Sequence, residues 1–370
     1  MSGGGGITIG GIVFPALALG LAAAFSAGEI WIQHLHPSIA FLPPLLAAAL
    51  IVGAVFATLQ HAELVGLKVG EPLGTVVLTI SVTIIEVAIM SSMIAHGDED
   101  PTEAREAVFS AIMIVCNGLV GLCLLLGGFR HGEQELHPMG ASAYLAVLIA
   151  LSVLTLVLPD FTTSSAGPTL TPPQLAFVSV LSILLYASFL FIQTVRHRSY
   201  FIDVHAAALG HGEMKPSLRD TILSVVGLGA SLLGVSLLAE RVIPALEAGL
   251  NWVGVQQINP VSGAIVSTVV LLPESLNSIR AAHRNALQTS LNGALGSVVA
   301  TIGLTVPAVA LLSLATEREI MFGLDKRDSA MLMLTLMLSV VSFGAGRTNV
   351  LTGLVHLVVF ATYVFFLFVP

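Results

Sequence analysis

Long apolar runs alternate with short polar breaks along almost the whole chain. A helix needs about 20 mostly apolar residues to cross a hydrocarbon core roughly 30 Å thick. Eleven runs approach that length, at approximately 9–27, 39–60, 73–95, 106–128, 141–159, 174–195, 218–240, 252–273 (continuing through Glu274), 286–313, 329–345 and 350–369. The pattern predicts an all-α integral membrane protein with about eleven transmembrane helices.

The first run, within residues 1–30, is predicted to be a retained helix. A secretory signal peptide carries Lys or Arg before its apolar run and small residues at a cleavage site. No Lys or Arg precedes this run, and Glu29, Ile30 and Trp31 follow it instead of a clear small-residue pattern.

The remaining ten runs fall into two sets of five. The longest polar stretch, a His-rich linker at 196–217, separates residues 31–195 from residues 218–370. Because five is an odd number, two such sets cross the membrane in opposite senses. Inverted repeats of this kind bind substrate near the midplane, between the repeats. The order therefore predicts two inverted five-helix repeats preceded by one extra amino-terminal helix.

Composition and charge agree with a membrane protein and narrow its partners. The 370 residues are 55% apolar and 10% charged, whereas soluble domains are about 25% charged. The chain has no basic patch and a net charge of −8, so we expect the lipid bilayer and not nucleic acid as its partner. Alternating the loops places nine Lys and Arg residues on one side and five, including Arg105 and Arg327, on the other. This asymmetry predicts a cytoplasmic amino terminus.

Two glutamates, Glu86 and Glu274, are the only charged residues that the pattern places deep inside apolar runs. A carboxylate in the bilayer interior costs at least a few kcal/mol, so it marks an ion or proton path by default. Glu86 lies 12 residues after Gly74 and Glu274 lies 11 after Gly263, which is roughly 17 Å of helix and near mid-hydrocarbon. Each occupies the second run of its set, so the pair predicts one central cation site. The alternative for either residue is a structural glutamate that is protonated or hydrogen-bonded between helices.

Hard oxygen donors accompany both glutamates. Thr83 and Thr79 lie three and seven residues before Glu86, on the same helical face, and Asn277 lies three residues after Glu274. Hydroxyl and amide oxygens suit Ca²⁺, Na⁺ or H₃O⁺ and are poor ligands for soft metals. Any single hydroxyl of this kind is equally at home in ordinary helix packing.

Three further residues are candidates for the cation shell or its backbone. Pro273 cannot donate a hydrogen bond to the Val269 carbonyl, which leaves a free oxygen near the second glutamate or marks only a packing kink. Asn117 and Asn292 are polar residues within apolar runs, and a buried amide needs several hydrogen-bond partners.

Sequence motifs give no support for an enzyme or a resident cofactor. The chain contains no HExxH, no Walker A sequence and no aspartate-rich pair. Cys116 and Cys123 lie seven residues apart on one helix, about 10 Å along its axis and too far to form a disulfide. Most histidines, among them His61, are assigned to loops, where they are solvated or sense pH.

Several segments resemble a known transporter family. The stretch PLGTVVLTISVTIIE from Pro72 to Glu86 resembles the first conserved repeat of bacterial calcium (sodium, potassium)/proton antiporters of the ChaA type, members of the cation/Ca²⁺ exchanger superfamily. Similar segments begin at Pro101, Leu272 and Gly346. The resemblance implies ten core helices in two inverted repeats, often with one extra amino-terminal helix.

The resemblance also implies roles for particular residues. The cation- and proton-binding glutamates of the family fall on Glu86 and Glu274, and Asn117 falls on a supporting position. In the second repeat, Ser297 aligns with the serine of a Gly-Ser pair, which places Ala300 opposite Asn117. The asparagine that precedes each glutamate in the wider superfamily is replaced by Thr83 and Leu271 in this chain.

We therefore expect a secondary antiporter in which Ca²⁺ and protons compete for two carboxylates. The proton gradient would drive extrusion of the cation across a bacterial inner membrane. Two alternatives remain open: Na⁺(K⁺)/H⁺ exchange at the same site, and a cation channel that moves no protons in return.

Overall fold

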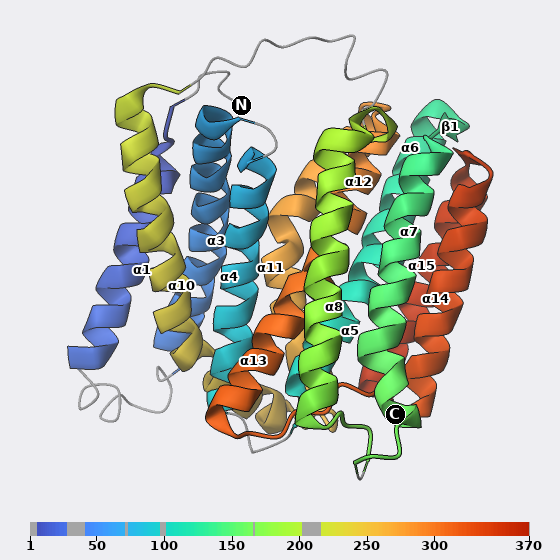
Figure 1. Cartoon of the computed structure of the whole chain (residues 1–370). Coiled ribbons are helices and arrows are strands. Elements are labelled where there is room, and N and C mark those ends of the chain that lie inside the picture. Colours follow the sequence, from blue (N-terminus) through green and yellow to red (C-terminus); the bar gives the residue numbers. More distant parts are fainter. Residues whose placement is uncertain are drawn as a thin grey trace. The chain divides into compact units, whose positions relative to one another are not determined.

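The computed structural model describes residues 6–27, 41–70, 73–96, 101–165, 167–201 and 216–369 (Figure 1). These residues form two compact units. The first is drawn from Met1–Glu99 and His211–Val255, and the second from Asp100–Gly210 and Gln256–Pro370.

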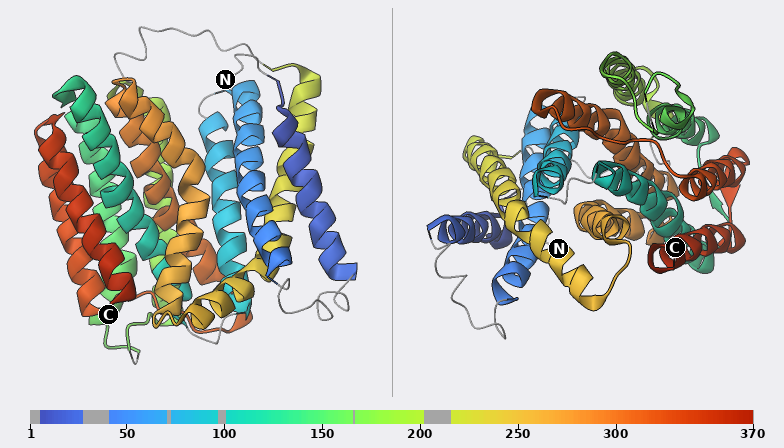
Figure 2. Two further views of the ribbon diagram at one scale, coloured as in Figure 1. Left: turned by 180° about the vertical axis from the view of Figure 1, so that it is seen from behind. Right: turned by 90° about the horizontal axis from the view of Figure 1, so that it is seen from below.

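The described part of the first unit consists of four long helices. They are α1 (Ile9–Ala27), α3 (Leu42–Val69), α4 (Leu73–His96) and α10 (Leu218–Val253). Helix α10 packs against each of the other three (Figure 2). Ser217 begins α10 by accepting a hydrogen bond from the Asp220 backbone at 3.1 Å, which satisfies one of the free N–H groups of the first turn.

The second unit contains the remaining helices and a short two-stranded antiparallel sheet. Its elements are α5 (Glu103–Met113), η1 (Ile114–Leu119), α6 (Val120–His131), β1 (Gln134–Glu135), α7 (Pro138–Ser152), η2 (Val153–Val157), η3 (Leu158–Phe161), α8 (Pro172–Phe191), η4 (Ile192–Arg196), η5 (Arg198–Tyr200), α11 (Ile258–His283), α12 (Leu287–Ala300), η6 (Thr301–Thr305), α13 (Val306–Thr316), α14 (Lys326–Gly344), β2 (Arg347–Thr348) and α15 (Val350–Phe368). Strands β1 and β2 pair antiparallel, Gln134 opposite Thr348. Elements η1 and η6 are π-helical turns between two α-helical stretches, and the π-helical turns η2 and η4 follow the ends of α7 and α8.

The prediction of an all-α, multi-pass integral membrane protein is confirmed. Ten helices among the described residues are long and apolar enough to cross a membrane. The remaining predicted run, the third at 73–95, corresponds to α4, whose apolar stretch, Val76–Ser92, is shorter. One boundary was wrong: the eighth run was predicted from residue 252, but α10 continues to Val253. Gly254, in the left-handed conformation at φ 84°, ends α10, so α11 begins only at Ile258.

The compact units differ from the two predicted repeats. Helix α10, the first of the predicted second set, belongs to the unit of α1, α3 and α4. The repeats are a relation of sequence order and remain a prediction. The third span of each set, Glu103–His131 and Leu287–Thr316, contains a π-helical turn, η1 in the first and η6 in the second, and π-helical turns also follow α7 and α8 in the first set. Most of the predicted linker at 196–217 lies outside the described residues.

A proline and a histidine explain how α1 docks on α3. Pro15 lies inside α1 and has no N–H to donate to the Gly11 carbonyl four residues earlier. The Nε2–H of His61 in α3 donates to that carbonyl at 2.8 Å. His61 is buried, with 1% of its surface exposed, so its assignment to a loop was wrong. An unpaired carbonyl is costly in lipid, and the histidine removes that cost.

The same histidine requires a glycine on the neighbouring helix. A Cβ atom at Gly227 of α10 would overlap the His61 ring, whereas a Cβ at Gly229, two residues on, would meet no atom within 4 Å. We expect Gly227→Ala to lower the free energy of unfolding by about 1–3 kcal/mol through overpacking. Gly229→Ala should be neutral or stabilising by up to about 1 kcal/mol, because alanine favours helix. Thermal unfolding in detergent measures both, and equal effects would contradict this packing.

Candidate functional site

Glu86 is a buried residue of α4 in the first unit, with 6% of its surface exposed. Thr83 and Thr79, about one and two turns before it, are half-buried. The neighbouring Ile85 is also buried. An ionisable side chain is therefore buried on a helical face that also carries two hydroxyls, as the sequence predicted.

Glu274 is a half-buried residue of α11 in the second unit, directly after the buried Pro273. Four residues on, the buried Ser278 points at α12: a Cβ on Gly293 would lie 2.9 Å from its hydroxyl oxygen. Asn277 is exposed and accepts a 3.5 Å hydrogen bond from Arg280. Of the predicted ligands around Glu274, Asn277 thus has the most accessible side chain.

The two glutamates belong to different compact units. Each unit supplies one carboxylate from a long apolar helix, α4 in the first and α11 in the second. The meeting of Glu86 and Glu274 in one cation site stays a prediction. Among the described residues, no three His, Cys, Asp or Glu side chains gather into a metal-binding group.

Asn117 is fully buried in η1, at the π-helical turn. Its Nδ2 donates to Thr335 Oγ1 of α14 at 2.8 Å, and its Oδ1 lies 3.3 Å from Nδ1 of His356 in α15. A weaker contact of 3.8 Å joins Nδ2 to the Met113 sulfur. The prediction that a buried amide here needs several partners is confirmed, and those partners come from two other helices.

Asn292 serves a different part of the second unit. Its Oδ1 accepts from Gln288 at 2.9 Å, and its Nδ2 donates to the Phe201 carbonyl. Its backbone carbonyl accepts from the Tyr144 hydroxyl at 3.3 Å. Asn292 therefore ties α12 to α7 and to the first residues of the predicted linker.

Ser297 lies on α12, one turn after Gly293. Its hydroxyl oxygen is buried and has no hydrogen-bond partner among the residues that the structure describes. A buried hydroxyl in this condition is available to a ligand. The resemblance implied that Ser297 supports the cation shell, and this role stays a prediction.

His356 is the residue that the sequence reasoning missed. It lies in the middle of α15, the last apolar helix, and is fully buried. Ser342 of α14 and Asn117 are both within hydrogen-bond distance of its ring nitrogens, at 2.9 and 3.3 Å. The signal was present, because an ionisable residue inside an apolar run is a functional candidate by default.

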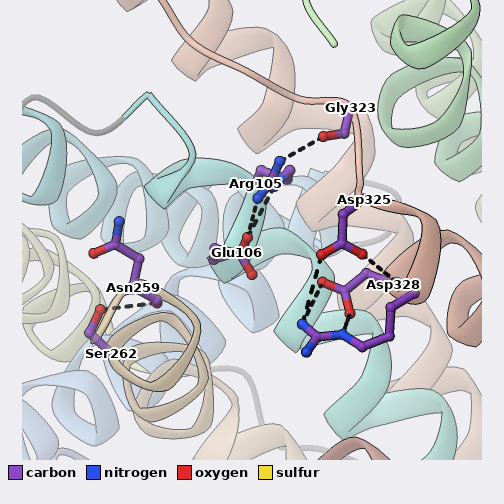
Figure 3. Close-up of polar contacts among 8 residues, drawn as sticks. Arg105, Glu106, Asn259, Ser262, Gly323, Asp325 and Asp328 are labelled. Carbon is purple, nitrogen blue, oxygen red and sulfur yellow. Dashed lines mark hydrogen bonds and ion pairs between the residues drawn. The ribbon is translucent and has the colours of Figure 1, made fainter. Parts of the chain in front are cut away.

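A buried ion cluster at one end of the second unit was also missed, because its residues stand at the ends of apolar runs (Figure 3). Arg105 pairs with Glu106 at 2.5 Å and donates to the Gly323 carbonyl at 2.8 Å. Arg327 pairs with Asp328 at 3.0 Å. Glu106 and Asp328 are only 3% and 6% exposed. The bond from Arg105 to Gly323 ties the start of α5 to the segment that precedes α14.

Comparison with known proteins gives a consistent result. A family model described as sodium/calcium exchanger protein matches residues 7–195 and 223–369. The Sinorhizobium fredii protein y4hA is 42% identical over 344 residues, 92% of each chain. The sodium-potassium/proton antiporter ChaA of Escherichia coli is 35% identical over 364 residues, 96% of this chain and 95% of that one. The crystal structure of the Ca²⁺/H⁺ antiporter protein YfkE has a similar fold, with a TM-score of 0.71 at 15% identity, covering 97% of this chain and 99% of that one.

The buried ion cluster yields a prediction about stability. Arg105→Met leaves the buried Glu106 without its cation, and we expect a loss of about 3–5 kcal/mol in the free energy of unfolding. The double variant Arg105→Met/Glu106→Gln should recover most of that loss. Arg347 and Glu135 form a matched exposed pair at 2.9 Å, so Arg347→Met should cost less than about 1 kcal/mol. Unfolding in detergent measures all three, and similar losses for the two single variants would contradict the assignment.

Proposed function

The chain belongs to the sodium/calcium exchanger protein family, and on that premise we propose that it is a secondary antiporter exchanging a hard cation for protons. One observation carries the proposal. Each compact unit holds a single predicted site glutamate within a long apolar helix, Glu86 in α4 and Glu274 in α11. Carboxylates in such positions are retained where they bind ions or protons.

Charge balance favours Ca²⁺ as the transported cation. Two ionised carboxylates neutralise one divalent cation, and hydroxyl, amide and backbone oxygens complete a shell of six to eight ligands at about 2.3–2.6 Å. The predicted shell residues are Thr83, Thr79, Asn117, Asn277, Asn292 and Ser297, with the carbonyl freed by Pro273. Each of these groups offers an oxygen atom as a ligand, the type that Ca²⁺ prefers.

Competition between the cation and protons explains coupling without ATP. When the cation leaves, two carboxylates remain in surroundings of low dielectric constant, where burial and mutual repulsion both favour the protonated form. Protons then occupy the oxygens that the cation held, so the two cannot be bound together. Movement of helices that exposes the site to alternate sides makes each exchange an antiport step.

Na⁺(K⁺)/H⁺ exchange at the same site is the second candidate function. The observation that favours it is the 35% identity, over 96% of this chain, to the sodium-potassium/proton antiporter of Escherichia coli. A cation channel is less well supported, because the family is one of exchangers. The bilayer that we propose is a bacterial inner membrane, with the amino terminus in the cytoplasm.

Neutralising either glutamate tests the proposal. We expect Glu86→Gln and Glu274→Gln to reduce cation-evoked proton flux in proteoliposomes to the level of empty vesicles, because glutamine keeps the shape but neither binds a proton nor neutralises a cation. Glu135→Gln is the matched control, since that side chain is exposed, and its flux should stay normal. Near-normal flux in both site variants would remove the proposal.

The identity of the cation follows from a gradient experiment. Proteoliposomes with a preset pH gradient receive Ca²⁺, Na⁺ or K⁺ outside, and a pH-sensitive dye reports the gradient. Ca²⁺ is expected to collapse it, with saturation and with a lower apparent affinity at more acidic pH, because protons compete for the carboxylates. Collapse by Na⁺ or K⁺ alone selects the second candidate. Cation uptake without any proton movement and without saturation at slow turnover selects neither candidate and indicates a channel.

A further inference from the structure

A series of hydrogen bonds connects side chains in the interior of the second unit. It begins at Ser342, whose hydroxyl lies 2.9 Å from Nε2 of His356, and continues from Nδ1 of His356 to Oδ1 of Asn117 at 3.3 Å. Nδ2 of Asn117 then donates to Thr335 Oγ1 at 2.8 Å, and the Thr335 hydroxyl reaches the Met331 carbonyl at 2.8 Å. The series links η1, α14 and α15.

The last bond fixes the direction of all the others. A carbonyl oxygen only accepts, so the Thr335 hydroxyl donates to Met331 and has lone pairs left for Asn117. The amide of Asn117 therefore directs its NH₂ to Thr335 and its oxygen to His356. That oxygen can only accept, so Nδ1 of His356 carries the proton. In the neutral ring Nε2 is then the acceptor of the Ser342 hydroxyl.

Packing holds the imidazole in this position. Helix α15 approaches α6 closely: a Cβ atom on Gly353 would lie 2.6 Å from the Leu125 backbone nitrogen. The His356 ring stacks on Phe343, with centroids 6.1 Å apart and planes inclined by 20°. His356 is fully buried, so water cannot replace these contacts.

Asn117, which these hydrogen bonds hold in place, lies on an element that packs against α11, the helix of the predicted cation ligand Glu274. Element η1, which carries Asn117, packs against α15 on one side and also against α11, the helix of Glu274. The π-helical turn widens the backbone at this point, a feature common at functional sites. After the bond from His356, Oδ1 of Asn117 retains one lone pair.

We propose that His356 is a positioning residue for transport: as the neutral Nδ1–H tautomer, it fixes the Asn117 amide so that its oxygen is presented to the transported cation. This inference rests on the proposed function. It assigns His356 no share in carrying the proton. Loss of the Nδ1–H donor lets the amide rotate, which weakens cation binding and leaves the later steps of exchange intact.

Two substitutions at one position separate the two ring nitrogens. Asparagine places an amide N–H close to where Nδ1 stands and so keeps a donor to Asn117. Glutamine reaches the position of Nε2 and keeps the bond to Ser342 but loses the donor. We expect His356→Asn to keep the KM for Ca²⁺ within about twofold of wild type. His356→Gln should raise KM roughly fivefold, the worth of one hydrogen bond of about 1 kcal/mol, with an unchanged maximal rate per folded protein.

Proteoliposome flux under an imposed pH gradient measures KM and maximal rate for both variants, with Na⁺ or K⁺ in place of Ca²⁺ if the wild-type protein transports those. His61→Gln is the control for altering a buried histidine, because glutamine retains the donor to Gly11, and its KM should be unchanged. Equal KM values for the two His356 variants, or a fall in maximal rate without a change in KM for His356→Gln, would overturn the inference.

A second variant covers the case in which His356→Gln does not fold. Thr335→Val has nearly the same shape and removes the acceptor on the other side of Asn117, so its KM should also rise by roughly fivefold. An unchanged KM in that variant counts against the inference. Glu86→Gln, measured in parallel, tests the exchange site itself. If that variant transports normally, the proposed site fails, whereas the asparagine–glutamine comparison still reports whether Asn117 contacts the cation.

Discussion

A polar group inside a hydrocarbon layer must find its partner within the protein, and this constraint shapes the structure at every level. It confines the described membrane-length segments to helices, whose backbone groups pair within one segment. Where a helix cannot satisfy itself, a neighbouring side chain completes the pairing. Pro15 leaves the Gly11 carbonyl open in α1, and His61 of α3 donates to it. This hydrogen bond adds a polar contact to the packing of α1 on α3.

The second unit applies the same rule to side chains. Asn117 would be costly in an apolar bundle, but Thr335 and His356 engage both ends of its amide. A buried Glu106 would be more costly still, and it is paired with the half-buried Arg105. Partners matter for such groups, since an unpartnered buried amide or charge costs more than the bond would contribute. The polar interior is therefore ordered, and its order extends across helices that are distant in sequence.

Glu86 and Glu274 differ from these structural groups in what can satisfy them. In the proposed function their partners are ions that bind and leave, because the same low dielectric constant that makes an empty carboxylate unfavourable makes a bound cation or proton favourable. Antiport follows from this exchange of partners. The ordered network around Asn117 and the α11 glutamate lie on elements that pack together, and on this packing rests the proposal that a fixed amide influences the transported ion.

The sequence by itself determined the class of the protein, the ten spans with α4 as an eleventh, and the two candidate glutamates. The length of an apolar run and the position of a charge within it are properties of one short segment, and they decide whether that segment crosses a bilayer. It also identified Asn117 as an amide that needs partners. It did not identify those partners, because Thr335 and His356 are 218 and 239 residues away along the chain. Only the tertiary structure brought them together, and only it showed that Glu106 and Asp328, which stand at the ends of apolar runs, are buried. Burial and pairing across such distances depend on how the helices pack. The apolar periodicity of one helix does not specify which residues of other helices contact it.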